Sequence, residues 1–419
     1  MGIKFSKLTI YDWRQFANID IDFHDRLTII TGGNGAGKST VLRLLAQHFG
    51  WGSSLLATPR ISKTGTRTYS TGLWDLFSPK PEPQGVRIGE LTYSNGIVST
   101  LRVPAAGEIQ YNVIIQNQQS IEGVNISSHR PVSNYQQIGN IPTNALGAQE
   151  AYGSYFNETM NRYRNGYTQF SPTYRMKEAL ISMAMFGPGN QYVQKNDSVL
   201  AVFEGFKSIL SNILPKSIGF RDISVRVPDV VIMTDSGDFV IDAASGGIMS
   251  LIDLAWQIFL YSRDKEDFVV ILDEPENHLH PTMQRTILSS LISSFPKAQF
   301  VVATHSPFIV SSVKDSFVYV LKHERSTQSE KTKIINSVTS IRLDNANKAG
   351  TASDILREVL GVPVTLPEWA EVEMRDIAAN FVVNDLNTDT ISKLRAQLDQ
   401  AGLGEFYPDA LMQIVNRGD

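Results

Sequence analysis

The sequence of 419 residues contains no cysteine, which excludes disulfide bonds, thiolate metal sites and thiol catalysis. It also lacks an excess of positive charge, because 38 lysines and arginines stand against 42 aspartates and glutamates. The formal net charge of −4 restricts any nucleic-acid contact to a local patch, so charge does not support such a partner. The first residues open a strand pattern rather than a secretory signal, and we expect a cytoplasmic protein.

Long apolar runs are also missing. The longest, residues 179–186, is far shorter than the roughly 20 residues that a membrane-spanning helix needs, so we expect no membrane contact. The heptad repeats of a long coiled coil are missing too. With 42% hydrophobic and 19% charged residues, the composition suits one large α/β domain with insertions, or two domains.

The first chemistry lies in a glycine-rich loop after a short apolar strand. Residues 3–12 and 17–23 alternate like half-buried strands, residues 27–30 form an apolar strand, and residues 41–48 read as a helix. A loop of the form G-x-x-x-x-G-K-[ST] between strand and helix cradles phosphates with backbone amides and the helix N-terminus. The residues predicted to bind ATP are Gly32, Asn34, Gly35, Ala36, Gly37, Lys38, Ser39 and Thr40.

Two side chains of this loop have further roles. Lys38 brings a cation to the phosphates, and the hydroxyl of Ser39 is a ligand for Mg²⁺. The alternative is a strand-to-helix turn with a chance lysine, which three glycines in the correct frame disfavour.

A second block follows the apolar run 268–272, which is typical of a strand buried on both faces. The run ends in Asp273-Glu274-Pro275-Glu276, at the end of the strand where α/β sheets bind ligands. We expect Asp273 to hold Mg²⁺ through water. We expect Glu274 to polarise the water that attacks the γ-phosphate.

A histidine follows the next buried strand, residues 300–303. An imidazole at this edge can reach the γ-phosphate, so we predict a catalytic role for His305. A metal cluster of His278, His280 and His305 is the alternative, and it is disfavoured because the spacing lacks the i, i+4 signature of helical metal sites.

A second anion-binding element precedes the acidic strand. Ser245, Gly246 and Gly247 begin a helix expected at 248–261, which offers free amides, a hydroxyl and the helix dipole. We expect this element to lie too far from the loop at Lys38 to grip the same nucleotide. Two molecules packed head to tail would each lend it to the ATP of the other.

These blocks, in this order, resemble the ABC ATPase superfamily, and within it the branch of SMC-like repair ATPases and overcoming-lysogenization-defect proteins. The opening Tyr11-Asp12-Trp13-Arg14-Gln15-Phe16 resembles N-F-R-x-F, which implies that Arg14 approaches the phosphates. Residues 273–281 resemble the DEPExHLHP of that branch, where transport ATPases usually have an aspartate in place of His280. The resemblance implies that His305 is a switch histidine. It also implies that the loop 277–281 crosses a dimer interface.

Two departures from the family pattern stand out. The signature reads Ala-Ala-Ser-Gly-Gly-Ile, without the usual leucine and glutamine. The glutamine that binds magnesium and senses the γ-phosphate in this family is not identifiable, and the candidates are Gln116, Gln118, Gln136 and Gln137.

The predicted fold is α/β: an ABC ATPase head, with a P-loop core sheet and an antiparallel β layer, an inserted helical lobe and a helical C-terminal tail. Residues 86–126 read as the strands of the β layer, 148–214 as two or three helices, and 282–294 as one helix. The expected divisions are 1–147, the N-terminal lobe with the P-loop; 148–216, the helical lobe; 217–340, the C-terminal lobe; and 341–419, the helical region.

Two stretches are candidates for partner contact. Residues 60–67 are basic, and residues 155–177 interleave aromatics with cations, which can stack on bases or seat a protein partner. An amphipathic helix with a solvated basic face is the favoured interpretation of the second stretch.

The tail after His305 reads as strands near 316–322 and 331–337, then helices near 352–360, 368–382 and 388–402. Proteins of the overcoming-lysogenization-defect family carry a metal-dependent Toprim nuclease at this end. Such a domain needs a glutamate and an Asp-x-Asp pair on strands. Asp385 and Asp389 are wrongly spaced for that pair, so we expect no nuclease in this chain.

Short ABC heads of this kind resemble the ATPase components of the anti-phage systems PARIS and Septu and of retron-associated modules. The favoured hypothesis is a slow regulatory ATPase that dimerises or forms larger homo-oligomers through ATP and Mg²⁺. It would act as sensor and scaffold for a separate effector, a nuclease encoded nearby. The main alternative is a DNA-repair or recombination ATPase that itself clamps DNA. A transporter subunit is disfavoured by the long separation of Ser245 from Lys38 and by His280.

Overall fold

The structure is a computed structural model, and it describes residues 2–52, 54–61, 67–70, 85–104, 109–128, 134–327, 334–344, 348–361, 367–381 and 387–416. The chain divides into two units, Met1–Ile355 and Leu356–Asp419. This division lies later in the chain than the boundary at residue 341 expected from the sequence. Within the described residues, no helix is long and apolar enough to span a membrane.

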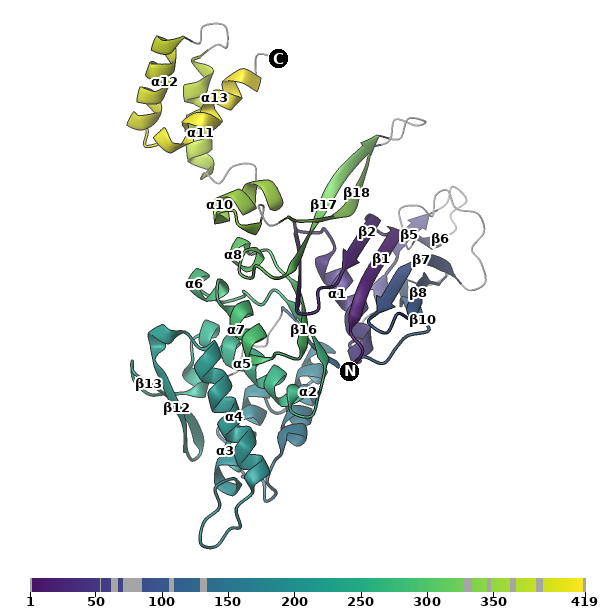
Figure 1. The fold of residues 1–419 in the computed structure, drawn as a ribbon, viewed down its shortest axis with the longest axis vertical. Coiled ribbons are helices and arrows are strands. Elements are labelled where there is room, and N and C mark those ends of the chain that lie inside the picture. The colour runs from purple at the N-terminus through teal and green to yellow at the C-terminus, as the bar shows by residue number, and fades with distance from the viewer. Residues whose placement is uncertain are drawn as a thin grey trace. The chain divides into compact units, whose positions relative to one another are not determined.

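The first unit is built on a mixed sheet of eleven described strands, in the order β10-β8-β7-β1-β2-β18-β17-β3-β16-β15-β11 (Figure 1). Strands from opposite ends of the unit lie side by side in it, because β18 pairs with β2. The strands are β1 Phe5–Trp13, β2 Phe16–Asp22, β3 Leu27–Gly32, β7 Val86–Tyr93, β8 Val98–Val103, β10 Ile114–Gln116, β11 Gly123–Ile126, β15 Phe268–Asp273, β16 Ala298–Ala303, β17 Phe317–Thr327 and β18 Ile334–Arg342.

One half of the sheet is parallel and buried. The neighbouring strands within the series β17, β3, β16, β15 and β11 pair in parallel, whereas β17 pairs antiparallel with β18 on its other side. Every residue of β3 and β16 is buried, as their continuous apolar sequences predict. Parallel strands end at a common edge, so the residues that follow β3, β15 and β16 come together there.

The other half is antiparallel and continuous with the first. Strands β1, β2, β7, β8 and β10 pair antiparallel, as expected for the β layer. The expectation that residues 86–126 all belong to this layer is wrong for β11, which pairs in parallel with β15 at the opposite edge of the sheet. A run of four residues carries too little periodicity to distinguish the two kinds of pairing.

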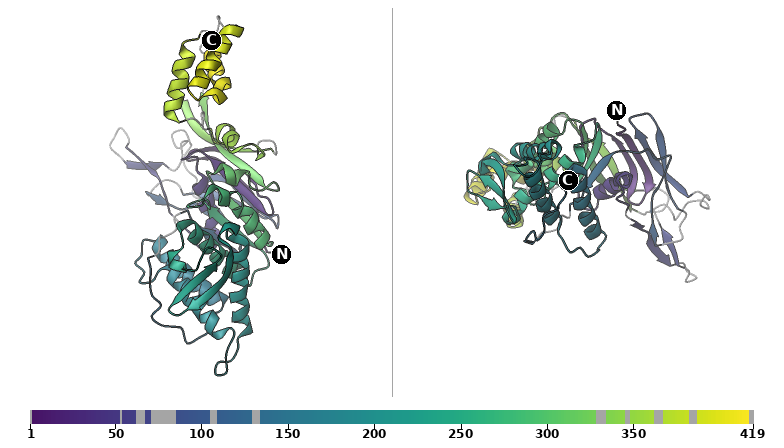
Figure 2. Two further views of the ribbon diagram at one scale, coloured as in Figure 1. Left: turned by 90° about the vertical axis from the view of Figure 1, so that its left-hand side faces the viewer. Right: turned by 90° about the horizontal axis from the view of Figure 1, so that it is seen from below.

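Helices α2 (Ala148–Tyr163), α3 (Pro172–Phe186) and α4 (Asp197–Ile213) form the helical lobe, together with the small sheet of β12 (Phe220–Arg226), β13 (Asp229–Thr234) and β14 (Phe239–Val240). The lobe packs on α5 (Gly246–Ser262), as Figures 1 and 2 show. Pro172 takes the first position of α3, where a proline gives up no helical hydrogen bond. Ser171 caps this helix by accepting from the amide of Tyr174.

The remaining elements of the first unit connect these layers. They are α1 (Lys38–Ala46), β4 (Leu55–Leu56) paired with β9 (Gln110–Tyr111), β5 (Thr58–Ile61) paired with β6 (Arg67–Ser70), α6 (Pro281–Gln284), α7 (Ile287–Ser294), α8 (Pro307–Val310) and α10 (Ala352–Asp354). The single helix expected at 282–294 is two helices. The turn at Arg285 and Thr286 separates them, and the Gln284 side chain is held by Leu279 O and the Ser306 hydroxyl.

The second unit contains α11 (Glu368–Ala379), α12 (Thr388–Gln400) and α13 (Tyr407–Asn416). The first two agree with the sequence, and α13 was not predicted although Ala410, Leu411 and Ile414 follow helical spacing. The three helices share a small core of Ala370, Met374, Ala378, Leu394, Leu398, Leu403, Ala410 and Ile414. Asp389 lies in the first turn of α12, and Asp385 lies outside the described residues.

Candidate functional site

The glycine-rich loop joins β3 to α1 and depends on glycine at two places. Gly32 has φ +143°, and a Cβ there would lie 2.3 Å from the carbonyl oxygen of Leu321 on the neighbouring strand. Gly37 has φ +97°, and a Cβ there would meet the ring of Phe16 at 2.4 Å. Both the backbone conformation and the close neighbours therefore require glycine.

Lys38 begins α1 and turns back along the loop. Its side chain is buried, and Nζ donates to the carbonyl oxygens of Gly32 at 3.0 Å and Gly33 at 3.2 Å. Burial lowers the pKa of this ammonium group, and the carboxylates of Glu274 and Asp273 partly offset that effect. The Lys38 ammonium group thus lies among the carbonyl oxygens of the loop and is attracted by the carboxylates at the end of β15.

Ser39 and Asp273 come together from α1 and the end of β15. Burial raises the pKa of Asp273, and the nearby Ser39 hydroxyl partly offsets that effect. Oδ1 of Asp273 is buried without a hydrogen-bond partner among the described residues. A buried carboxylate oxygen with an open coordination position next to a serine hydroxyl fits a divalent cation such as Mg²⁺.

Glu274 follows directly and has an unusual backbone conformation, with φ +49°. Its amide donates to Ala303 O at 2.9 Å, which joins the ends of β15 and β16. Its Oε2 accepts from the Asn277 side chain at 3.0 Å, and its Oε1 lies 3.9 Å from Nε2 of His305. A non-glycine residue with positive φ is uncommon, and here the surrounding contacts hold the carboxylate toward His305.

Glu276 holds the loop that carries His305 by accepting hydrogen bonds from it, a role that the sequence did not reveal. Its Oε1 accepts from the Thr304 hydroxyl at 2.6 Å and from the backbone amide of His305 at 2.9 Å. Burial raises the pKa of this carboxyl group. Burial and the nearby Lys38 lower the pKa of His305, so the imidazole is neutral at neutral pH.

The turn between β1 and β2 contacts the glycine loop through two residues to which the sequence analysis assigned no role. Nε2 of Gln15 donates to Gly35 O at 3.3 Å, and the ring of Phe16 lies against Gly37. Arg14 lies in the same turn with φ +52° and is half-buried. The structure therefore brings the turn that carries Arg14 to the loop.

Ser245 is the N-cap of α5 and makes no side-chain capping bond. Ser245 and Gly246 are exposed, whereas Gly247 is buried, and a Cβ there would lie 2.8 Å from His278 O. The nearest atoms to Gly246 and Gly247 belong to His278 and Met283 rather than to the glycine loop. This long helix thus begins at the surface with Ser245 and Gly246, beside the loop that follows the acidic strand.

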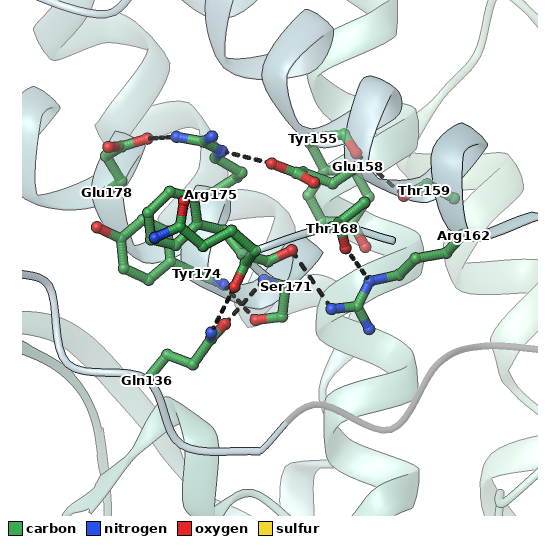
Figure 3. Close-up of polar contacts among 12 residues, drawn as sticks. Gln136, Tyr155, Glu158, Thr159, Arg162, Thr168, Ser171, Tyr174, Arg175 and Glu178 are labelled. Carbon is green, nitrogen blue, oxygen red and sulfur yellow. Dashed lines mark hydrogen bonds and ion pairs between the residues drawn. The ribbon is translucent and has the colours of Figure 1, made fainter. Parts of the chain in front are cut away.

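A cavity of about 430 Å³ adjoins Ser39 and Asp273. Strand β11 lines it through Asn125, and Ser127 and Ser128 follow that strand into the same cavity. None of the four candidate glutamines lines it. Gln116 pairs with Arg102 on the far edge of the sheet, and Gln136 bonds within the helical lobe (Figure 3). The other lining residues are Leu42, Arg43, Trp51, Thr159, Arg162, Tyr163 and Asn165.

Several aromatic and basic side chains at 155–177, among them Arg162, Tyr174 and Arg175, make contacts inside the helical lobe (Figure 3). Arg175 pairs with Glu158 and Glu178, and Arg162 donates to the Thr168 hydroxyl and to Phe170 O. The favoured interpretation, an amphipathic helix with a solvated basic face, does not hold for this stretch: it spans the end of α2 and the start of α3, and Arg162 and Arg175 contact neighbouring residues. Most of the basic stretch at 60–67 lies outside the described residues.

The alternative of a histidine metal cluster has no structural support. Across the part of the chain that the structure describes, no group of three histidine or acidic side chains is placed to hold a metal ion. His280 instead caps α6 by accepting from the amide of Thr282.

Parts of the sequence match known protein families and individual proteins. Residues 27–311 match the family "AAA domain, putative AbiEii toxin, Type IV TA system", and residues 5–46 match the "P-loop containing region of AAA domain". The chain is 22% identical to a Septu protein PtuA of Bacillus mycoides (strain KBAB4) over 94% of its own length. That alignment spans about half of the relative, 50%. This chain is also 21% identical to a Septu protein PtuA of Bacillus thuringiensis, over 83% of this chain and 82% of the relative.

Two further similarities are more limited. A retron Vc95 probable ATPase of Vibrio cholerae serotype O1 biovar El Tor is 38% identical over 13% of this chain and 10% of its own length. The solved Smc head domain with an extended coiled coil, bound to the C-terminal domain of ScpA derived from Pyrococcus furiosus, is 14% identical, with a TM-score of 0.42 over 85% of this chain and 99% of that one. The resemblance to Septu and retron-associated ATPases is confirmed. With more than half of its length matched and a P-loop of this geometry, the chain belongs to the AAA-domain family described as "putative AbiEii toxin, Type IV TA system" and is a P-loop ATPase.

Proposed function

We propose that the chain binds ATP with Mg²⁺ at the shared edge of β3, β15 and β16 and hydrolyses it slowly. The observation that carries the proposal is the convergence of phosphate-binding, acidic and imidazole groups at this edge. They come from three strand ends that are separated in sequence. The residues are Lys38, Ser39, Asp273, Glu274 and His305.

The P-loop from Gly32 to Thr40 binds the phosphates, with Lys38 as the cation. Ser39 and Asp273 hold Mg²⁺, which neutralises charge on the β- and γ-phosphates when bound. Arg14 approaches the phosphates from the β1–β2 turn. The buried Asp273 oxygen and its serine neighbour support this assignment.

Glu274 orients the attacking water and accepts its proton. Asn277 binds one of its carboxylate oxygens at 3.0 Å, so the other oxygen remains for water. The neutral imidazole of His305 donates a hydrogen bond to the γ-phosphate, and Glu276 holds the backbone of that histidine in place.

The active assembly is a homodimer or a larger homo-oligomer closed by ATP. Ser245, Gly246 and Gly247 present an anion-binding helix end on the surface, and their neighbours belong to the loop after the acidic strand. In the closed assembly they bind the γ-phosphate of the ATP held by a second copy. The rate of ATP hydrolysis therefore depends on whether two copies of the chain have closed around the nucleotide.

The biological role is that of a cytoplasmic sensor and scaffold in anti-phage defence, acting on a separate effector, a nuclease encoded nearby. The similarity to Septu PtuA proteins and to a retron probable ATPase supports this role. The chain spans about half the length of the first of these relatives.

The test is purification of the Glu274→Gln variant from its native gene neighbourhood with Mg-ATP, followed by measurement of mass and composition. The expected result is ATP-bound closed dimers with turnover at least roughly 10²-fold slower, because the proton acceptor is lost. Glu266→Gln, on an exposed residue just before the other end of β15, is the matched control and keeps wild-type turnover.

The composition of the assembly separates the two candidate roles. A second protein that co-purifies supports the scaffold, and its chemistry identifies the effector. A homodimer bound only to nucleic acid contradicts the scaffold and leaves the DNA-clamp alternative. Wild-type turnover by Glu274→Gln would show that another group accepts the proton.

A further inference from the structure

A buried ion pair joins the helical lobe to the segment that carries Ser245. Lys177 lies on α3 and Asp242 lies in the short 3-10 helix Ile241–Ala243, three residues before Ser245. Lys177 Nζ is 2.8 Å from Asp242 Oδ2, and the two side chains are 0% and 5% exposed. Ion pairs buried to this degree are uncommon, because two charges are taken out of water.

The same ammonium group also holds the segment that follows β11. It donates to Gln136 O at 2.6 Å and lies 4.9 Å from the ring of Tyr135. The Gln136 side chain accepts from the Ser171 amide at 2.8 Å and donates to Gln169 O at 3.0 Å (Figure 3). Lys177 therefore joins three segments: α3, the chain between β11 and α2, and the residues before α5.

The segment before α5 is anchored at its start by β14, where Val240 pairs with Val231 of β13, and it has few other anchors from there to Ser245. Ile241 is fully buried, and Ala244 N donates to Ile241 O at 3.2 Å, a bond within the segment itself. Ser245 makes no side-chain capping bond and is exposed. Separating the buried Asp242 from Lys177 would leave unpaired charges in the interior, which is strongly unfavourable. The contact therefore fixes the position of the backbone that leads into Ser245.

We infer that Lys177 and Asp242 are positioning residues for the composite ATP site: they hold Ser245, Gly246 and Gly247 where a second copy's ATP can meet them. The inference rests on the proposed function, because it needs a site shared by two copies. It adds the helical lobe as the element that sets the position of this surface.

The ion pair can be replaced as a unit, so its positioning role can be tested separately from its effect on stability. Replacing a buried ion pair by apolar residues of similar volume is often neutral for stability, whereas removing one partner is strongly destabilising. The double variant Lys177→Met/Asp242→Leu therefore removes the tie without leaving a lone buried charge. Arg175→Met is the matched control, since Arg175 lies two residues away on α3 and makes ion pairs with Glu158 and Glu178 that do not involve the Ser245 segment.

The experiment places both variants in a Glu274→Gln background. It measures the Kd for a fluorescent ATP analogue, the Kd of ATP-dependent dimerisation by analytical ultracentrifugation, and thermal unfolding. We expect the double variant to fold and to bind nucleotide within about twofold of its parent. Its dimerisation should weaken at least about tenfold, while Arg175→Met dimerises like the parent.

The outcomes are distinguishable. If the Glu274→Gln parent itself does not dimerise with ATP, the composite site fails and the inference fails with it. If the parent dimerises and a folded, nucleotide-binding double variant dimerises equally well, the proposed function stands and the positioning role is overturned. If Arg175→Met weakens dimerisation to the same extent, the effect belongs to the lobe in general and the specific role of Lys177 is overturned.

Discussion

Nζ of Lys38 lies 3.4 Å from Nδ1 of His305, so the P-loop cation and the histidine after β16 are in direct contact. On its other side the same imidazole is 3.9 Å from Glu274 Oε1. The histidine thus lies between the group assigned to the phosphates and the group assigned to the water. Burial lowers the pKa of both Lys38 and His305.

Lys38→Met keeps the aliphatic stem and removes the charge. We expect the fold to persist and the affinity for ATP to fall on the order of 10²-fold, since loss of a charged contact costs about 3 kcal/mol. Isothermal titration with Mg-ATP measures the effect. Lys348→Met is the matched control, because Lys348 is also buried and donates to the backbone oxygens of Lys314 and Ser316. Equal loss of affinity in the two variants would contradict the assignment.

Ser245→Arg places a bulky cation on the exposed N-cap of α5. It should bind ATP normally and fail to close, so its turnover should be close to zero. When mixed with Lys38→Met protein, it should regain turnover. The mixed dimer contains one complete site, with the P-loop of one copy and the helix end of the other. Steady-state turnover across mixing ratios tests this. Normal activity of Ser245→Arg alone would remove the composite site.

Glu276→Ala removes the acceptor for the Thr304 hydroxyl and the His305 amide. We expect turnover to fall on the order of 10²-fold, as it should in His305→Ala, with ATP affinity unchanged. The double variant should be no slower than either single variant, because both lose the same imidazole contact. Glu276→Gln keeps an acceptor oxygen and should retain most activity. Additive losses in the double variant would contradict the positioning role.

The buried His48 should make the free energy of unfolding depend on pH in the acidic range. Burial lowers its pKa from 6.5 to about 4, and its ring nitrogens contact Leu45 O and the Tyr93 hydroxyl at 2.9 Å. Below pH 6.5 the unfolded chain binds a proton that the folded chain does not, so stability falls as the pH falls. Between pH 7 and pH 5 the free energy of unfolding should drop by about 2 kcal/mol from this residue.

Urea unfolding at the two pH values measures that drop. His48→Gln should reduce the pH dependence by about the same 2 kcal/mol. His24→Gln, at another partly buried histidine, serves as the control and should leave it in place. An unchanged pH dependence in His48→Gln would show that other groups cause it.

The parts of the fold and site that could be predicted are those that are continuous in the chain. The P-loop, the apolar strands β3, β15 and β16, and the acids after β15 each occupy a short run. Burial on both faces and strand-to-helix geometry leave a direct pattern in such a run. Parallel strands end at one edge, so the convergence of Lys38, Asp273 and His305 followed from the order of the motifs.

Other features depended on partners that are distant in sequence. Glu276 was visible in the acidic motif, but its role came from the backbone of His305, which only folding brings near. The strand β11 is too short for its pairing to show in its periodicity, and it joined the opposite edge of the sheet.

The sequence by itself thus determined the chemistry at the strand ends, because each motif carries its phosphate-binding or acidic groups within a few residues. Tertiary structure alone decided how those groups are supported: Gln15 and Phe16 against the P-loop, and Lys177 against Asp242 before Ser245. A buried lysine in a helix looks like any solvated lysine in sequence, and only the packed structure shows that its counterion is a distant aspartate.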